Sequence, residues 1–147
     1  MKFRLIIDEH KDEEIVATVH HRSSLTDQIE DLVRKYSGND QIVGYREDEL
    51  VMLSFEKIEC ITVENGKTYA IDMSGKRYRL KQRLYEVETM IPSSFLRINK
   101  SALANMNCVE RFVATYSGGV NARFVSGYEE YVSRRCFAAI KRRFDSK

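Results

Sequence analysis

The sequence is poor in the residues that build disulfide frameworks, metal sites and long linkers. Its 147 residues include one proline, seven glycines, three cysteines and no tryptophan. So little proline and glycine argues against low-complexity segments and long disordered linkers. The cysteines are far apart and form no C-x-x-C pair, which argues against a disulfide framework or a zinc ribbon. We expect Cys60, Cys108 and Cys136 to be buried or half-buried free thiols.

Long hydrophobic runs are also missing. No apolar stretch approaches the ~18 residues that a membrane-spanning helix needs. The first eight residues alternate in polarity and lead into acidic residues, so they lack the basic and apolar regions of a secretory signal. At 43% hydrophobic residues the chain has enough for one core. These features predict a cytoplasmic protein of one domain with a small appendage.

The common enzyme motifs are absent. The sequence contains no G-x-S-x-G, G-x-x-x-x-G-K-S/T, H-E-x-x-H or G-x-G-x-x-G. All three histidines lie in the first 21 residues, and the adjacent pair His20 and His21 would point to opposite faces of a strand. We therefore predict a protein that is not an enzyme, with no catalytic residue, no metal site, no cofactor and no small-molecule substrate.

Charge is distributed unevenly along the chain, although the net charge is only +2. Residues 1–40 carry six Lys/Arg against nine Asp/Glu, a net charge of −3. Residues 41–147 carry 18 Lys/Arg against 13 Asp/Glu, a net charge of +5. A basic part behind an acidic one indicates a polyanionic partner, although many solvated surfaces share this pattern.

The first 40 residues are predicted to form a β-β-α appendage. Residues 3–7 and 15–19 are rich in β-branched residues and read as short strands. A three-turn helix should follow, with Ser24 as its cap and Gly38 just past its end. Its inward face is expected to consist of Leu25, Ile29, Leu32, Val33 and Tyr36.

Short strands dominate the remaining residues, 41–147, which we assign to one mainly β domain. The strongest turn signal is Asn65-Gly66, between expected strands at residues 58–64 and 67–72. The other expected strands are 41–46, 50–54, 76–80, 95–98, 109–115, 120–125 and 128–132. Many short strands separated by turn residues predict an antiparallel architecture and not a βαβ one.

Two helices interrupt or end this pattern. A short one is expected from Leu84 to Ile91, where Pro92 stops it. A last helix should begin at Ser133 as its cap. Its inward residues are expected to be Cys136, Phe137, Ile140 and Phe144.

Polar and basic residues follow three of the expected strands. They are Lys67, the run Asn99-Lys100-Ser101 and the run Ser133-Arg134-Arg135. Such side chains suit phosphate oxygens and the guanine edge, and a rigid β framework can present them in loops. By spacing alone, solvated rim charges explain these residues slightly better.

Five motifs, in order along the chain, resemble the LytTR family. The run F-L-R-I-N-K-S-A-L-A-N, from Phe95 to Asn105, resembles the family signature F-x-R-I-H/S/N-R/K/N-S-x-L/V-V/A-N. The other four are Ile58-Glu59, Leu84-Tyr85-Glu86-Val87-Glu88, Tyr131-Val132-Ser133-Arg134-Arg135 and Ile140-Lys141-Arg142-Arg143-Phe144. Each motif is weak, but together they are specific.

The resemblance implies a stack of small antiparallel β-sheets with short helices that binds double-stranded DNA. In this family inter-strand loops reach successive major grooves. Carried over by position, the base-reading residues are Lys67, Lys100 and Arg135, and the phosphate-binding residues are Ser101, Tyr131, Ser133 and Arg134. Asn99 stands where His is frequent, and Ala104 where Val is common, so we expect altered sequence preference or packing and not lost binding.

The chain also resembles the stand-alone LytTR regulators, which have a short N-terminal β/α segment. Most family members carry a receiver domain upstream, and 40 residues are too few for one. The stand-alone subgroup is often paired with a small membrane-bound regulatory protein, which the acidic residues 1–40 would contact. We also expect a homodimer on DNA repeats about one helical turn, or a multiple of it, apart. The alternative is a protein-interaction or ligand-sensing β module without DNA binding.

Overall fold

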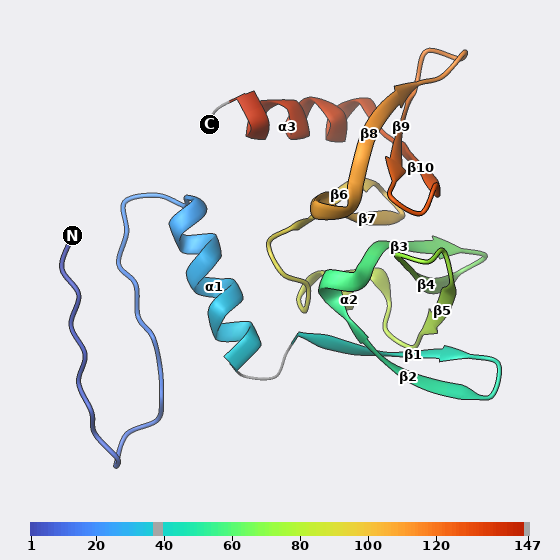
Figure 1. The fold of residues 1–147 in the computed structure, drawn as a ribbon. Coiled ribbons are helices and arrows are strands. Elements are labelled where there is room, and N and C mark those ends of the chain that lie inside the picture. Colours follow the sequence, from blue (N-terminus) through green and yellow to red (C-terminus); the bar gives the residue numbers. More distant parts are fainter. Residues whose placement is uncertain (37–39, 146–147) are drawn as a thin grey trace.

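Two antiparallel β-sheets account for most of the chain from residue 41 onward (Figure 1). The computed structural model describes residues 1–36 and 40–145. One sheet has seven strands in the order β2-β1-β5-β4-β3-β7-β6, and the other has three in the order β10-β9-β8. The first contains β1 (Gln41–Arg46), β2 (Glu49–Ser54), β3 (Ile58–Glu64), β4 (Lys67–Asp72), β5 (Arg77–Leu80), β6 (Phe95–Asn99) and β7 (Ala102–Asn105). The second contains β8 (Val109–Ala114), β9 (Val120–Phe124) and β10 (Glu129–Val132).

Helices connect and flank these sheets. The α-helices are α1 (Ser24–Tyr36), α2 (Leu84–Glu88) and α3 (Arg134–Asp145). Two 3-10 helices, η1 (Phe55–Lys57) and η2 (Met106–Cys108), lead into β3 and β8. The predicted mainly β, LytTR-like architecture is therefore confirmed.

The centre of the seven-stranded sheet, at β3, is buried on both faces. Along a strand, successive side chains point to opposite sides, and in β3 every residue from Ile58 to Thr62 is buried. Ile61 belongs to a cluster with Phe55, Leu80 and Val87 on one side. Cys60 belongs to a second cluster that includes Phe124 of β9 and Ile140 of α3. This second cluster joins the two sheets to α3.

The cysteines lie where the composition predicts. Cys60 and Cys108 are buried, Cys136 is half-buried, and all three are free thiols. Burial raises the pKa of the Cys60 thiol, with the neighbouring Glu130 and Glu59 carboxylates adding to the shift. The inward face predicted for α3 is correct for Cys136, Phe137 and Ile140. It is wrong for Phe144, which is 50% exposed because the last turn of α3 runs past the edge of the sheets (Figure 1).

The appendage departs from its predicted β-β-α form. Residues 1–23 contain no assigned strand and are exposed throughout, although residues 3–7 and 15–19 run as extended chain (Figure 1). The alternating apolar pattern is present, but a lone pair of short strands is only marginally stable in water. Among residues 1–36 and 40–145, no sheet or helix buries these segments.

The predicted helix is present, but the face that was expected to point inward points outward. Leu25, Leu32, Val33 and Tyr36 are exposed, Ile29 is half-buried, and no residue of α1 is fully buried. The cap is Ser23 and not the predicted Ser24. The Ser23 carbonyl accepts the first hydrogen bond of the helix, from the Asp27 N–H at 3.1 Å, and Ser24 is the first residue of α1. The predicted stop, Gly38, lies outside the described residues.

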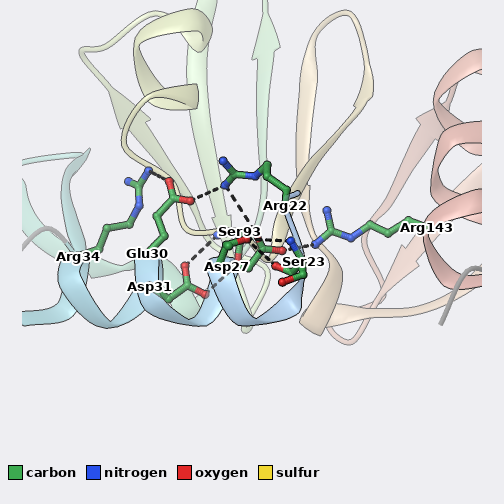
Figure 2. Close-up of polar contacts among 9 residues, drawn as sticks. Arg22, Ser23, Asp27, Glu30, Asp31, Arg34, Ser93 and Arg143 are labelled. Atoms are coloured by element: carbon green, nitrogen blue, oxygen red, sulfur yellow. Dashed lines mark hydrogen bonds and ion pairs between the residues drawn. The ribbon is translucent and has the colours of Figure 1, made fainter. Parts of the chain in front are cut away.

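Polar contacts hold α1 against the rest of the chain (Figure 2). The Asp31 carboxylate accepts hydrogen bonds from the Ser93 N–H at 3.1 Å and the Ser93 hydroxyl at 2.8 Å. Arg143 of α3 lies 3.6 Å from the Asp27 carboxylate. Glu30 pairs with Arg22 and Arg34 on the same surface, and the hydrogen bond from Arg22 lowers the pKa of Glu30 most strongly. The acidic side of α1 is therefore its docking face.

Replacing Asp31 with Ala is expected to release α1 without unfolding the β domain. Two hydrogen bonds to Ser93 are lost, each worth about 1 kcal/mol. Hydrogen exchange of the α1 amides should therefore accelerate by about 30-fold, while exchange in β3 stays unchanged. Lys35→Ala, on an exposed position of the same helix, is the matched control. Equal acceleration in both variants, or none in either, would mean that Asp31 does not hold the helix.

No helix within residues 1–36 and 40–145 is long and apolar enough to cross a membrane.

Candidate nucleic-acid interface

The β3–β4 hairpin presents Lys67 at its tip. Asn65 and Gly66 adopt positive φ angles of 52° and 75°, as a tight two-residue turn requires. Lys67 is the first residue of β4, directly opposite Glu64, and its side chain is exposed. The turn thus fixes the backbone of Lys67 and leaves the ammonium group in solvent.

The β6–β7 turn presents Lys100 and Ser101. Asn99, only 9% exposed, closes this turn: its side-chain oxygen accepts the Ser101 N–H at 2.7 Å. Arg97 donates to the Lys100 carbonyl at 2.6 Å and forms an ion pair with Glu88. The Lys100 side chain itself is exposed. A buried amide and a paired guanidinium therefore hold the backbone around one outward-facing lysine.

The junction between β10 and α3 presents Ser133, Arg134 and Arg135. The Ser133 hydroxyl accepts the Cys136 N–H at 3.2 Å, so Ser133 caps the helix as its sequence position predicts. Arg134 and Arg135 are exposed in the first turn. Tyr131, just before the cap, is 52% exposed.

Hydrogen bonds join these three segments to one another. The Ser133 backbone N–H donates to the Ile98 carbonyl at 2.8 Å, and the side-chain amide of Asn99 donates to the Tyr131 carbonyl at 2.7 Å. These bonds link the β6–β7 turn to the start of α3. The Val63 N–H donates to the Ser101 carbonyl at 2.9 Å, which links the β3–β4 hairpin to the same turn.

A partly buried carboxylate lies behind this junction. Glu130 accepts hydrogen bonds from the Tyr128 hydroxyl at 2.7 Å, from Thr62 at 3.2 Å and from the Asn99 amide at 3.4 Å. Burial, followed by the bond to Glu130, raises the pKa of the Tyr128 hydroxyl. Glu130 thus connects β3, the β6–β7 turn and β10.

Sequence reasoning placed the exposed residues of this region but missed the ones that support them. Lys67, Lys100 and Arg135 are all exposed, and their three segments are hydrogen-bonded neighbours. The contribution of Glu130 and Thr62 was not foreseen, because a carboxylate and a hydroxyl inside strands resemble ordinary surface residues. One signal was available: the acidic pair Glu129-Glu130 stands four residues before the basic pair Arg134-Arg135.

The family of this chain follows from its similarity to known proteins. The family model of the LytTr DNA-binding domain matches residues 48–145, two thirds of the chain. The chain belongs to the LytTR family. The LytTR motifs foreseen in the sequence occupy the β3 start, α2, β6–β7, the β10–α3 junction and the end of α3.

The chain is also similar to two transcriptional regulators over nearly their whole length, and to one solved structure in its fold. An uncharacterized HTH-type transcriptional regulator of Staphylococcus aureus (strain bovine RF122 / ET3-1) is 28% identical over 146 residues, covering 97% of both chains. A similarly named protein of strain NCTC 8325 / PS 47 is 27% identical with the same coverage. A solved LytTr DNA-binding domain from Bacillus cereus matches with a TM-score of 0.63 and 19% identity, covering 70% of this chain and 94% of that one.

The helix-turn-helix in the relatives' names does not describe the LytTR fold seen here. In residues 1–36 and 40–145, strands separate α1 from α2 and α2 from α3, so no two of these helices are joined by a short turn. The chain carries a LytTr DNA-binding domain, and its exposed basic residues lie at strand ends and at one helix start.

Proposed function

We propose that this protein is a transcription regulator that reads specific duplex DNA in the major groove through its inter-strand loops. Lys67, Lys100 and Arg135 contact bases in this proposal. The phosphate contacts come from Ser101, Tyr131, Ser133 and Arg134. The observation that carries it is the hydrogen-bonded junction that brings three exposed basic segments together on a LytTR scaffold.

The start of α3 supports two different kinds of contact. Amide groups at a helix N-terminus favour an anion, so Ser133 and the first-turn N–H groups suit a phosphate. Arg134 and Arg135 stand at the positive end of the helix dipole, where cations are disfavoured. A folded protein gains nothing from two arginines there, whereas a DNA-binding protein does. Arg135 is long enough to reach a base once the helix end sits on the backbone.

Salt dependence tests the proposal with duplex DNA. Four exposed cations, Lys67, Lys100, Arg134 and Arg135, belong to the proposed interface. Each cation placed against the duplex, at a phosphate or at a base edge, displaces about one condensed counterion. Affinity for mixed duplex DNA should therefore fall about a hundredfold between 50 and 200 mM salt. A protein-interaction or ligand-sensing module would bind neither a mixed nor a selected duplex at either concentration, and that result would refute the proposal.

The proposal includes two copies on DNA. One small domain reads a short site, and useful specificity in a genome generally needs more contacts than one domain makes. Two copies on repeats about one helical turn apart would supply them. In this proposal the protein acts in the cytoplasm, is not an enzyme and needs no cofactor.

Contact between the N-terminal segment and a membrane-bound regulatory protein stays a prediction. It is motivated by the net charge of −3 over residues 1–40 and by the exposure of residues 1–23. In this proposal the membrane-bound protein would contact the N-terminal segment, and the loops that carry Lys67, Lys100 and Arg135 would stay accessible to DNA.

A further inference from the structure

Exposed hydrophobic side chains are concentrated in the N-terminal quarter of the chain. Of the 20 large hydrophobic residues that are exposed, 12 lie between Met1 and Tyr36. They include Phe3 and Ile7, at 89% and 90% exposure, and Leu32 at 63%. Scattered surface hydrophobics are ordinary, but so many within one short segment indicate an interaction surface.

The domain of the same chain does not cover these residues. The bonds from Asp31 to Ser93 and the approach of Arg143 to Asp27 fix the polar side of α1 against the domain (Figure 2). That docking turns Leu32 and the other apolar residues of α1 away from the sheets. The uncovered apolar side of α1 is therefore a consequence of specific contacts.

The extended segments before α1 have the pattern of strands that lack a partner. Residues 3–7 and 15–19 are mostly apolar and rich in β-branched side chains, as strands are. A bend, closed by the Lys11 N–H donating to the Asp8 carbonyl at 3.4 Å, separates the two segments (Figure 1). Such a pair needs further strands or a helix to become stable.

We propose that residues 1–36 are a dimerisation surface whose occupant is the same surface of a second copy of this chain. The two N-terminal segments pair into one antiparallel sheet, and the apolar sides of both α1 helices pack on it. A two-fold axis makes the contact self-complementary, because each copy offers its N-terminal segments and the apolar side of α1 to the same elements of the other. The dimer forms without DNA. Its role in placing two domains on repeated sites rests on the proposed function.

Size and charge favour a second copy as the occupant. A standard interface uses roughly 20–30 residues from each side, and residues 1–36 supply that number. Residues 1–36 carry six Lys/Arg against eight Asp/Glu, so like-charge repulsion opposes self-association only weakly. An isolated chain would leave both the strand edges and the apolar side of α1 in water.

The test is the mass of the full chain in solution without DNA, measured by light scattering over a concentration series. We expect wild type at twice the chain mass of 17.2 kDa. Ile7→Glu and Leu32→Glu should raise the dimer dissociation constant at least tenfold, because each would bury a charge at the contact. Leu50→Glu in β2 is the matched control, since Leu50 is 62% exposed but lies outside this surface, and it should stay dimeric.

Hydrogen exchange provides a readout that needs no variant. The amides of residues 3–7 and 15–19 should be protected in wild type, and the protection should disappear on dilution. A wild-type chain that stays at 17.2 kDa up to about 100 µM, with these amides unprotected, would overturn the proposal and leave the surface to another protein. Leu50→Glu dissociating the dimer as strongly as Leu32→Glu would overturn it too. Binding of each variant to a single DNA half-site separates failure of this inference from failure of the proposed function.

Discussion

Replacing Arg135 with Ala is expected to abolish most of the preference for the cognate DNA site while weak binding to other duplexes persists. Arg135 is exposed in the first turn of α3, two residues after the Ser133 cap. A bidentate contact from an arginine to guanine is worth about 1–3 kcal/mol of discrimination. The ratio of cognate to scrambled affinity should therefore fall about 5- to 150-fold. Paired titrations with the two duplexes measure this ratio.

Arg142→Ala is the matched control for Arg135→Ala. Arg142 is an exposed arginine of the same helix, about two turns further along. It should weaken binding to both duplexes equally and reduce the salt slope by about one unit if it contacts a phosphate. An Arg135→Ala protein that keeps the wild-type affinity ratio would show that Arg135 is a solvated surface residue.

Replacing Asn99 with Ala is expected to weaken cognate binding by tenfold or more, although Asn99 itself is buried. The side chain holds the Ser101 N–H and the Tyr131 carbonyl, each at 2.7 Å, and so sets the spacing between two predicted contact loops. Without it these partly buried groups lose their partner, at a cost of about 1–3 kcal/mol in the free energy of unfolding. Asn99→His should retain most binding, because imidazole can also donate and accept, and LytTR proteins frequently have His at this position.

The loss of binding in Asn99→Ala must be separated from simple destabilisation. Ile71→Val is the matched control, because Ile71 is 1% exposed in the core and this change costs about 0.5–1.5 kcal/mol in the free energy of unfolding. It should lower the thermal midpoint without changing DNA affinity. If Ile71→Val and Asn99→Ala reduce affinity equally, or Asn99→His binds as weakly as Asn99→Ala, Asn99 does not position the loops.

The β domain was predictable where local signals and burial agree. The strands at 58–64 and 67–72 were placed to the residue, because Asn65-Gly66 defines the turn and its positive φ angles leave little choice of register. β7 (Ala102–Asn105) was missed as a strand. Its alanines have low strand propensity, and only pairing with β3 and β6 makes this segment extended.

The N-terminal segment illustrates the opposite case. Its residue pattern predicts strands and an apolar helix face, but a pattern does not specify the surface that will cover it. The helix packs through Asp31 because Ser93, far away in sequence, offers two donors to its carboxylate. Glu130 likewise connects β3 and the β6–β7 turn only because folding brings the donors of Thr62 and Asn99 to its carboxylate. Long-range polar contacts of this kind produce no periodic pattern in the sequence, so they could not be predicted from it.

Selection of bound duplexes from a random library, using the full-length protein, tests the central claim most directly. The account predicts a recurrent motif, present twice at about one helical turn or a multiple of it, and bound at least a thousandfold more tightly than a scrambled duplex. Recovery of no motif, with all duplexes bound equally or not at all, would contradict sequence-specific recognition by this LytTR protein.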